Sequence, residues 1–209
     1  MGINERKEKQ KLEIKRLILD ASMKLFVEEG FANVTFRRIA EIIEYSPTTI
    51  YLHFKDKNEI LFNLCEQGFS KMGEYNASLQ TIQNPLVRLH KMGENYINFG
   101  MAHPEYYDLM FIQKAPMETL NELHDDEWKS GHQALERLQS VIAECMEHGL
   151  IAEGELGAVA MGIWGMVHGL VSLAIRDRFE KLVAPEEVIS TMHKALNWMV
   201  GTMDLSIKK

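Results

Sequence analysis

The chain has 209 residues, 46% of them hydrophobic, and a net charge of −7. This length allows one or two domains with a buried core, and the charge excludes a protein that is basic throughout. The charge is unevenly spread: residues 1–58 contain 11 Lys/Arg and 9 Asp/Glu, whereas the remaining residues contain 12 and 21. A mildly basic head on an acidic body is typical of a DNA-binding module joined to a second domain.

Cysteine and histidine usage gives no indication of a metal centre. Cys65 and Cys145 lie far apart without a CxxC motif, and the histidines lack HExxH-like spacing. We therefore expect no metal, no cofactor and no disulfide framework. The first 15 residues are highly charged and lack the apolar segment of a signal peptide, so the expected location is the cytoplasm.

Helical periodicity runs along the chain, and no stretch alternates apolar and polar residues for long enough to indicate a strand. We therefore predict an all-α protein with about nine helices, several of which begin at a proline that follows a cap residue. The predicted helices are about Asn4–Glu29, one from Thr35, Ser46–His53, one from Asp56, Pro85–Ala102, Pro104–Phe111, Met117–Glu147, Glu155–Arg178 and Pro185–Met203.

The first four helices have clear boundary residues. Gly30 stands where a C-cap glycine ends the first helix, and Thr35 and Ser46 are N-caps of the next two. Asp56 and Glu59 form a D-x-x-E variant of the capping box at the start of the fourth. We place the domain boundary within this fourth helix. This gives a three-helix DNA-binding domain, 1–58, and a larger helical bundle for ligand sensing and dimerisation, 59–209.

Two short helices joined by a tight turn and supported by a longer first helix form a helix-turn-helix unit. The second short helix of such a unit fits the major groove of DNA. With Ile50 directed into the core, a step of about 100° per residue turns Thr48 and Leu52 outward, flanked by Thr49 and Tyr51. Methyl and hydroxyl groups on this face suit thymine and base edges. The candidate phosphate donors are Arg37, Arg38, Tyr51, His53, Lys55 and Lys57.

Each of these features alone also fits an ordinary helical bundle with solvated charges, so the interpretation depends on their order and spacing. The segment 35–61, TFRRIAEIIEYSPTTIYLHFKDKNEIL, resembles the DNA-binding signature of the tetracycline-repressor (TetR) family. The resemblance covers about residues 10–65. The matching positions are Ile39-Ala40, Ser46, Tyr51, His53, Phe54, Lys57 and Ile60-Leu61.

The resemblance implies a role for individual side chains. Positions that face bases in the family are occupied here by Arg37, Pro47, Thr48, Thr49 and Leu52. Positions that grip phosphates are occupied by Thr35, Tyr51, His53 and Lys57.

The turn departs from the family pattern, because Glu44-Tyr45 stands where members usually have glycine followed by an apolar residue. A left-handed conformation at Glu44 would cost on the order of 1 kcal/mol and would alter the angle of the recognition helix.

In the second domain, residues 162–173, GIWGMVHGLVSL, are similar to a Trp…His-Gly segment of one C-terminal subtype of this family. In the family the last two long helices pack against their partners as a four-helix dimer interface. The three glycines of the segment would let backbones approach closely. We therefore expect a homodimer built from Glu155–Arg178 and Pro185–Met203.

The same region raises the question of a membrane, because Leu156–Ile175 has about twenty residues without Asp, Glu, Lys or Arg. Its glycines and His168 lower its hydrophobicity, and it is a single run in the middle of the chain. We favour a helix buried between other helices and no membrane. A membrane-anchored regulator is the alternative.

The middle of the second domain is rich in methionine and aromatic residues, which suit a pocket for an apolar or aromatic small molecule, as family members commonly have there. An ordinary helical core has the same composition. A lone buried histidine such as His168 more often satisfies a backbone carbonyl than binds a ligand. The candidate ligand-binding residues are Phe99, Tyr106, Met110, Trp164 and His168.

The sequence thus predicts a dimeric regulator of transcription, a repressor released from double-stranded operator DNA by a small molecule. No GxSxG, Walker or GxGxxG motif is present, so we expect no enzyme, and a small helical enzyme is the weaker alternative. Repressor and activator use the same DNA-binding head, and the sequence leaves that choice open.

Overall fold

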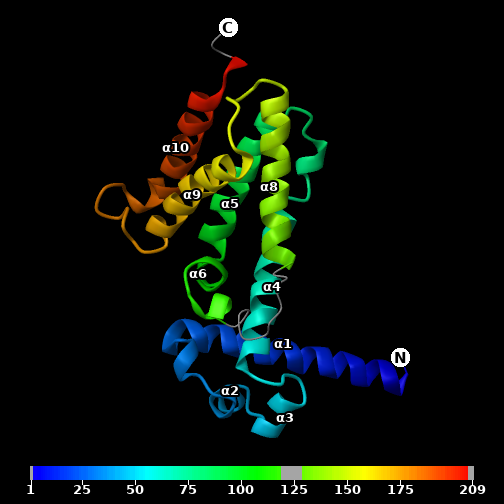
Figure 1. Cartoon of the computed structure of the whole chain (residues 1–209). Helices are drawn as coiled ribbons and strands as arrows, with labels where there is room; N and C mark the ends of the chain where they lie inside the picture. The colour runs from blue at the N-terminus through cyan, green and yellow to red at the C-terminus, as the bar shows by residue number, and fades with distance from the viewer. Residues whose placement is uncertain (1, 119–128, 207–209) are drawn as a thin grey trace. The chain divides into compact units, whose positions relative to one another are not determined.

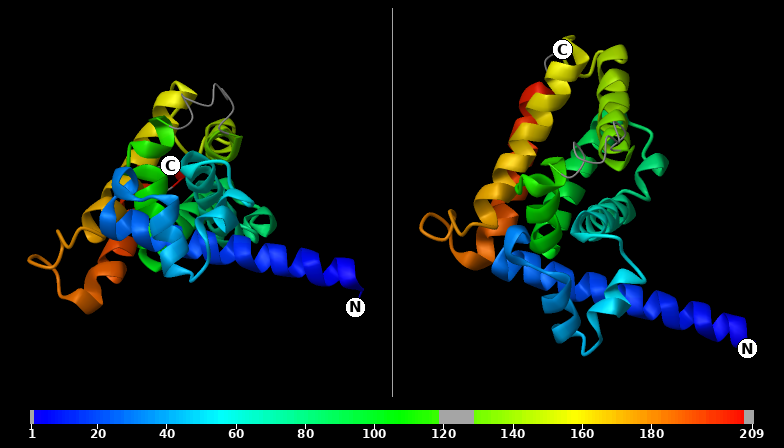
Figure 2. Two further views of the ribbon diagram at one scale, coloured as in Figure 1. Left: turned by 90° about the horizontal axis from the view of Figure 1, so that it is seen from below. Right: turned by 60° about the horizontal axis from the view of Figure 1, so that its bottom comes forward.

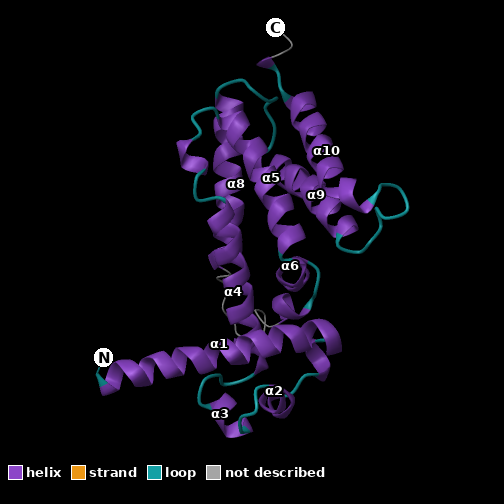
Figure 3. Cartoon of the chain, turned by 180° about the vertical axis from the view of Figure 1, so that it is seen from behind, coloured by secondary structure: helices purple, strands orange, loops and turns teal. Residues whose placement is uncertain are grey.

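The computed structural model describes residues 2–118 and 129–206. Every regular element among them is a helix, which confirms the predicted all-α class (Figures 1 and 3). The described residues divide into two compact units, which are 2–68 with 108–118, and 69–107 with 129–206. The chain passes between the units within one helix, between Gly68 and Phe69, and again within another, between Tyr107 and Asp108, and each unit is described below by itself.

The first unit contains three helices and a 3-10 turn, followed by the start of a fourth helix. They are α1 (Ile3–Glu29), η1 (Phe31–Asn33), α2 (Phe36–Ile42), α3 (Pro47–Tyr51) and α4 (Lys57–Tyr75). Gly30 ends α1 with φ +79°, as the C-cap glycine predicts. The core of this unit is made of fully buried aliphatic and aromatic side chains, among them Ile18, Phe26, Ile39, Ile50, Phe54 and Ile60.

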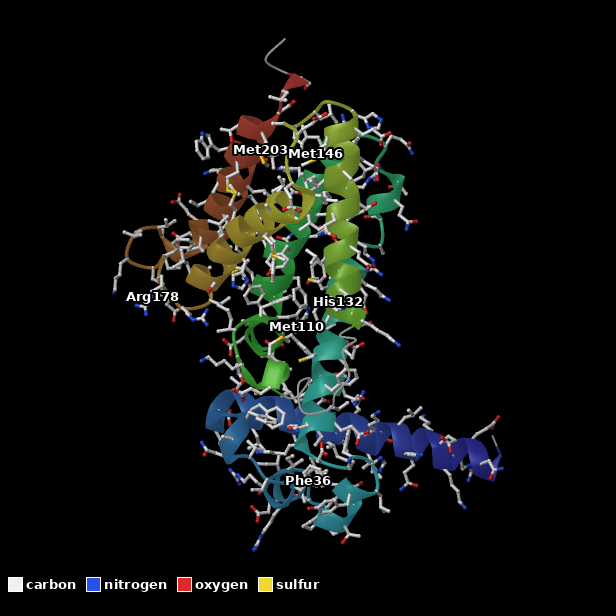
Figure 4. The ribbon with its side chains drawn as sticks, in the orientation of Figure 1. Phe36, Met110, His132, Met146, Arg178 and Met203 are labelled. Carbon is white, nitrogen blue, oxygen red and sulfur yellow. The ribbon has the colours of Figure 1, made fainter. Side chains whose placement is uncertain are left out.

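The second unit is organised around α5. It contains the ends of two shared helices, the second part of α4 and the first part of α6 (Pro104–Phe111). Its other elements are η2 (Leu79–Thr81), α5 (Pro85–Ala102), α8 (Lys129–Glu147), α9 (Leu156–Ala174), η3 (Pro185–Glu187) and α10 (Val188–Met203). Helix α5 packs against α8, α9 and α10 (Figure 1). Near the N-terminal end of α5, Met146 of α8 and Met203 of α10 pack on one hydrophobic cluster that includes Leu86 and Leu89 (Figure 4).

Two glycines explain how closely the other helices approach α5. A Cβ atom at Gly93 would lie 2.8 Å from Leu196 Cδ1 of α10, and one at Gly100 would lie 2.3 Å from Val171 Cγ1 of α9. An ion pair joins α5 to α8, since Arg88 Nη1 donates to both carboxylate oxygens of Glu144 at 2.9 and 3.0 Å. Helix α5 is thus held on three sides.

Several helix boundaries differ from those predicted. Helix α9 ends at Ala174, four residues before Arg178, and Asp177 beyond it has φ +57°. The first turn of the predicted helix Pro185–Met203 is the separate 3-10 turn η3. The predicted helix Met117–Glu147 is described only in part, since 119–128 lie outside the described residues, and α8 forms its second half.

Helix α9 is the one helix among the described residues that is long and apolar enough to cross a membrane, yet only 17% of an 18-residue stretch of it is buried within the chain. The sequence favoured a helix buried between other helices, and this chain supplies only part of that cover. The uncovered face has a helical repeat and consists of Gly162, Gly165, Met166, Gly169 and Leu173.

Candidate nucleic-acid interface

Helix α3 is short, and its first turn is fixed by capping. Ser46 Oγ accepts a hydrogen bond from the Thr49 backbone N–H at 3.2 Å, and Pro47 occupies the first helical position. Below the helix, Ile50 and Phe54 are fully buried in the core of the first unit. Caps and core together fix which side of α3 faces solvent.

The turn between α2 and α3 adopts the unusual conformation considered from the sequence. Glu44 has φ +58°, in the left-handed region that favours glycine. The following Tyr45 N–H donates to the Ala40 carbonyl oxygen at 3.0 Å and closes the turn. For a residue other than glycine, this conformation costs on the order of 1 kcal/mol.

The solvent side of α3 carries the side chains predicted to face DNA. Leu52 and Tyr51 are 75% and 64% exposed, and Pro47 and Thr48 are exposed as well, whereas Thr49 is half-buried. The Tyr51 ring packs on Phe36, which Figure 4 labels, with ring centroids 4.7 Å apart. An exposed leucine and tyrosine on a capped helix leave an amphipathic surface that the chain itself does not cover.

The arginines at the start of α2 are already engaged by carboxylates. Thr35 caps this helix by accepting the Arg38 backbone N–H at 3.2 Å. Two guanidinium nitrogens of Arg38 bind Glu29 Oε1 at 3.0 Å, and the hydrogen bond and charge of Glu29 raise the pKa of Arg38. Arg37 Nε donates to Glu41 Oε1 at 3.3 Å. A phosphate at this position would have to compete with these glutamates.

Lys57 lies in a different setting from the other predicted phosphate donors. Its Nζ donates to the carbonyl oxygens of Phe31 and Ala32 at 2.8 and 3.2 Å, and it lies 4.6 Å from the Phe31 ring centroid. Burial lowers the pKa of Lys57. This lysine ties the first turn of α4 to η1, whereas Lys55 nearby is exposed.

His53, just beyond the end of α3, is partly buried and lies near two lysines of α1. Burial lowers its pKa, and the charges of Lys11 and Lys15 from α1 lower it further. Lys15 Nζ also lies 5.3 Å from the Phe54 ring centroid. The sequence interpretation did not include these two lysines, whose relation to His53 is formed only by the packing of α1.

A hydrogen-bonded chain of aromatic side chains links α5, α6 and α9 in the second unit. Trp164 Nε1 donates to the Tyr96 hydroxyl at 3.0 Å, and that hydroxyl donates to the Tyr107 hydroxyl at 3.3 Å. The Tyr107 hydroxyl lies 2.7 Å from His168 Nδ1 and donates to the His168 carbonyl oxygen at 3.2 Å. Two predicted ligand residues, Trp164 and His168, thus share a polar cluster with two tyrosines.

The pKa values of the three titratable groups of this polar cluster, Tyr96, Tyr107 and His168, are shifted in the direction that favours their neutral forms. Burial raises the pKa of Tyr96 to about 12, and burial and Tyr96 raise that of Tyr107. Burial, and then the charge of Arg176, lower the pKa of His168. A neutral, hydrogen-bonded cluster can recognise a polar group of a ligand without adding a net charge to the interior.

The other predicted ligand residues are found elsewhere. Phe99 packs edge-on against Tyr75 at 6.1 Å between ring centroids and lies 5.7 Å from His103. Tyr106 lies 6.3 Å from His103 by the same measure. Met110 is buried but belongs to the first unit.

Comparison with known proteins gives two matches to family descriptions. Residues 18–64 match "Bacterial regulatory proteins, tetR family", and residues 89–196, more than half of the chain, match "Tetracyclin repressor-like, C-terminal domain". The chain belongs to the TetR family. Its members are transcriptional regulators, as the sequence predicts for this chain.

Individual TetR relatives are distant. The chain is 19% identical over 167 residues to the uncharacterised regulator YobS of Bacillus subtilis, covering 79% of this chain and 81% of YobS. It is 30% identical over 91 residues to the repressor AcnR of Corynebacterium diphtheriae, 44% of this chain and 42% of AcnR. The structure of AibR with isovaleryl coenzyme A and operator DNA has a TM-score of 0.67 at 17% identity, over 91% and 97% of the two chains. That likeness shows a common fold.

The two matched segments of this TetR protein include both candidate sites. The first segment contains α2, the turn and α3, and the second contains Tyr96, Tyr107, Trp164 and His168. Sequence reasoning missed Tyr96, because its partners lie 11 and 68 residues away in the chain. No pattern in the sequence indicated that Tyr96 of α5 would face Trp164 of α9.

Proposed function

We propose that this TetR protein is a homodimeric repressor that binds a near-palindromic operator through α3 and is released by a small molecule. The observation that carries the proposal is the solvent face of α3, where Thr48, Tyr51 and Leu52 stand on a helix fixed by its cap and by buried Ile50. Methyl groups and hydroxyls in this arrangement suit base edges in the major groove.

Within this proposal the side chains divide into two groups. Arg37, Pro47, Thr48, Thr49 and Leu52 face bases, while Thr35, Arg38, Tyr51, His53 and Lys55 serve phosphates. Lys57 does not contact phosphate directly in this proposal, because its ammonium is bound to two carbonyl oxygens. It instead holds α4 in the position in which neighbouring residues reach phosphate. Phosphate contacts fix the register of the head, and base contacts select the sequence.

The dimer interface in this proposal is the uncovered face of α9 together with α10. Met161, Met166 and Leu173 are exposed on α9, and Trp198 on α10 is 71% exposed. Gly162, Gly165 and Gly169 have open space where a Cβ would stand, so a second helix could approach the backbone closely. Obligate dimer interfaces are more apolar than transient ones, and the exposed side chains of this face are apolar. A bilayer would cover the same face, and flotation with liposomes distinguishes a membrane-anchored regulator from a cytoplasmic dimer.

The effector in this proposal is an apolar or aromatic molecule that carries a polar group. The neutral polar cluster of Tyr96, Tyr107, Trp164 and His168 supports this chemistry, because it offers hydroxyl, indole and imidazole groups within an apolar helical unit. Phe99 and Tyr106 of the same unit remain candidates for the apolar part, and Met110 is a separate candidate in the first unit. We also retain the assignment of residues 162–173 to the Trp-His-Gly subtype, for which the participation of Trp164 and His168 in one cluster is the support.

Release requires the effector to bind one arrangement of the dimer more tightly than the other. A hundredfold loss of DNA affinity corresponds to about 2.7 kcal/mol of coupling, and DNA must weaken effector binding by the same factor. AibR, whose structure contains both a coenzyme A ester and operator DNA, and AcnR, named a repressor, support this type of regulation for the present chain.

The test is selection of duplexes from a randomised pool by the purified protein. We expect enrichment of an inverted repeat whose half-sites lie about one helical turn, 34–36 Å, apart or somewhat more. Recovery of no duplex above background would contradict DNA binding. Enrichment of a single half-site without symmetry would contradict the dimer.

A further inference from the structure

The N-terminal half of α1 projects beyond the helix-turn-helix. Figures 1 and 2 show α1 continuing past α2 and α3 toward the N-terminus. Residues 4–13 are exposed throughout, whereas Ile18 and Leu19, a turn or two further on, are buried. The projecting turns therefore have no packing role in the first unit. Their surface is available to a partner.

Positive charge dominates this projection and is arranged by helical phase. Residues 4–16 contain six Lys/Arg and three Glu. Lys7, Lys11 and Lys15 are spaced by four residues and, at about 100° per residue, fall within about 60° of Ile18. Since Ile18 is fully buried in the first unit, these three lysines continue the side of α1 that faces the helix-turn-helix.

One observed contact supports this orientation at the inner end of the stripe. Lys15 Nζ lies over the ring of Phe54, the residue that follows His53. The charges of Lys11 and Lys15 both act on His53, at the end of α3. The stripe of Lys7, Lys11 and Lys15 is thus continuous with the predicted phosphate-contacting end of the recognition helix.

The charges on the rest of the projection allow a matched comparison. Arg6, Lys9 and Arg16 lie more than about 100° from Ile18 around the helix, on the side away from α3. Two of the three glutamates are on that far side as well, and only Glu8 borders the lysine stripe. Within the described part of the chain, neither Lys7 nor Lys11 forms an ion pair with a carboxylate.

We propose that the N-terminal half of α1 is a second DNA-contacting element, in which Lys7, Lys11 and Lys15 bind backbone phosphates next to those contacted by α3. The inference rests on the proposed function and extends it. From Lys15 to Lys7 the helix rises about 12 Å, enough to reach more than one phosphate. Such contacts add affinity and salt dependence but carry no sequence information.

The test compares two triple variants with the same change in charge. One carries Lys7→Gln, Lys11→Gln and Lys15→Gln. The other carries Arg6→Gln, Lys9→Gln and Arg16→Gln. The probe is a duplex selected from a randomised pool by the unaltered protein, and its Kd is measured between 50 and 200 mM KCl. Circular dichroism verifies that both variants keep their helix content.

We expect the first triple to reduce the slope of log K against log salt by about 0.9 for each lost contact, so by about 2–3 in all. The second triple should change this slope by less than one, and neither should change the preferred sequence. In a separate variant, Glu8→Gln should strengthen binding, because it removes the acidic neighbour of the stripe.

Each outcome has a separate meaning. Equal losses in the two triples would show that charge alone matters, and unchanged slopes in both would show no contact, so either result overturns the inference. If the unaltered protein binds no duplex at all, the proposed function itself fails.

Discussion

Helices α3 and α9 both expose apolar side chains to solvent, but in different company. On α3, exposed Leu52 and Tyr51 stand beside threonines, with lysines just beyond. On α9, exposed Met166 and Leu173 stand beside glycines, and no charged residue occurs within the helix. The first surface suits a polyanion with methyl groups in its groove, and the second suits another apolar helix. Exposure alone therefore does not define a partner; the neighbouring residues do.

The largest expected effect comes from comparing a buried and an exposed residue of α3. Ile50→Ala should lower the free energy of unfolding by about 2–5 kcal/mol, because Ile50 is fully buried. Leu52→Ala, two residues on, should change it by less than about 0.5 kcal/mol and weaken DNA binding instead. Urea unfolding measures the stability of the two variants, and a duplex-binding titration measures the DNA affinity of Leu52→Ala. Equal destabilisation by the two variants would mean that the solvent face of α3 is assigned wrongly.

Two glycine substitutions distinguish the face of α9 that packs on α5 from the face of α9 that the chain leaves uncovered. Gly100→Ala places a methyl group 2.3 Å from Val171 Cγ1 and should destabilise the fold by about 1–3 kcal/mol. Gly165→Leu enters open space within the chain, so it should preserve helix content but dissociate the dimer. Thermal unfolding and analytical ultracentrifugation measure these effects. A Gly165→Leu protein that remains dimeric at micromolar concentration would exclude this face of α9 from the interface.

Lys57 sharpens the distinction between positioning and contact at the DNA interface. Lys57→Met should lower stability by about 1 kcal/mol for each lost hydrogen bond to the carbonyls of Phe31 and Ala32. DNA affinity should fall through misplacement of η1 and α4, while the salt slope stays within experimental error. A slope reduced by about 0.9 would instead indicate a direct phosphate contact. Lys55→Met is the matched control on an exposed lysine.

A smaller effect concerns pH and the polar cluster of the second unit. The pKa of His168 is lowered below the usual 6.5, so the unfolded chain binds more protons than the folded one as pH falls below that value. Stability should therefore decrease as pH falls through 6.5 toward the folded pKa. His53, whose pKa is also lowered, adds to the same slope. The free energy of unfolding, measured with urea at pH 7.5 and 5.5, should differ less between the two pH values in His168→Gln than in the unaltered protein. An unchanged difference would mean that His168 does not cause this pH dependence.

Local chemistry explains what the sequence predicted well. The start of α3 is specified by Ser46 and Pro47 within a few residues, and its orientation by Ile50, so both the helix and its solvent face could be derived without a structure. The resemblance also marked Glu44 as a position usually held by glycine, and the structure shows there the left-handed conformation that the sequence could only raise as a condition.

Contacts distant in sequence explain what could not be predicted. The role of Lys57 depends on carbonyl groups 25 and 26 residues earlier, and the polar cluster depends on hydroxyls 61 to 72 residues from His168 and Trp164. No periodicity encodes such pairings. The end of α9 was placed four residues too late, at Arg178, because no glycine or proline between Ala174 and Pro185 marks the point where the backbone leaves the helix.

If the solvent face of α3 reads base sequence, parallel selections of duplexes with the unaltered protein and with Thr48→Ala should recover different sites. Thr48 is exposed on α3, so its loss should leave stability unchanged. We predict that the preferred base changes at the same position in both half-sites, with a discrimination difference of about 1–3 kcal/mol. Identical selected sequences for the two proteins would contradict this role of α3.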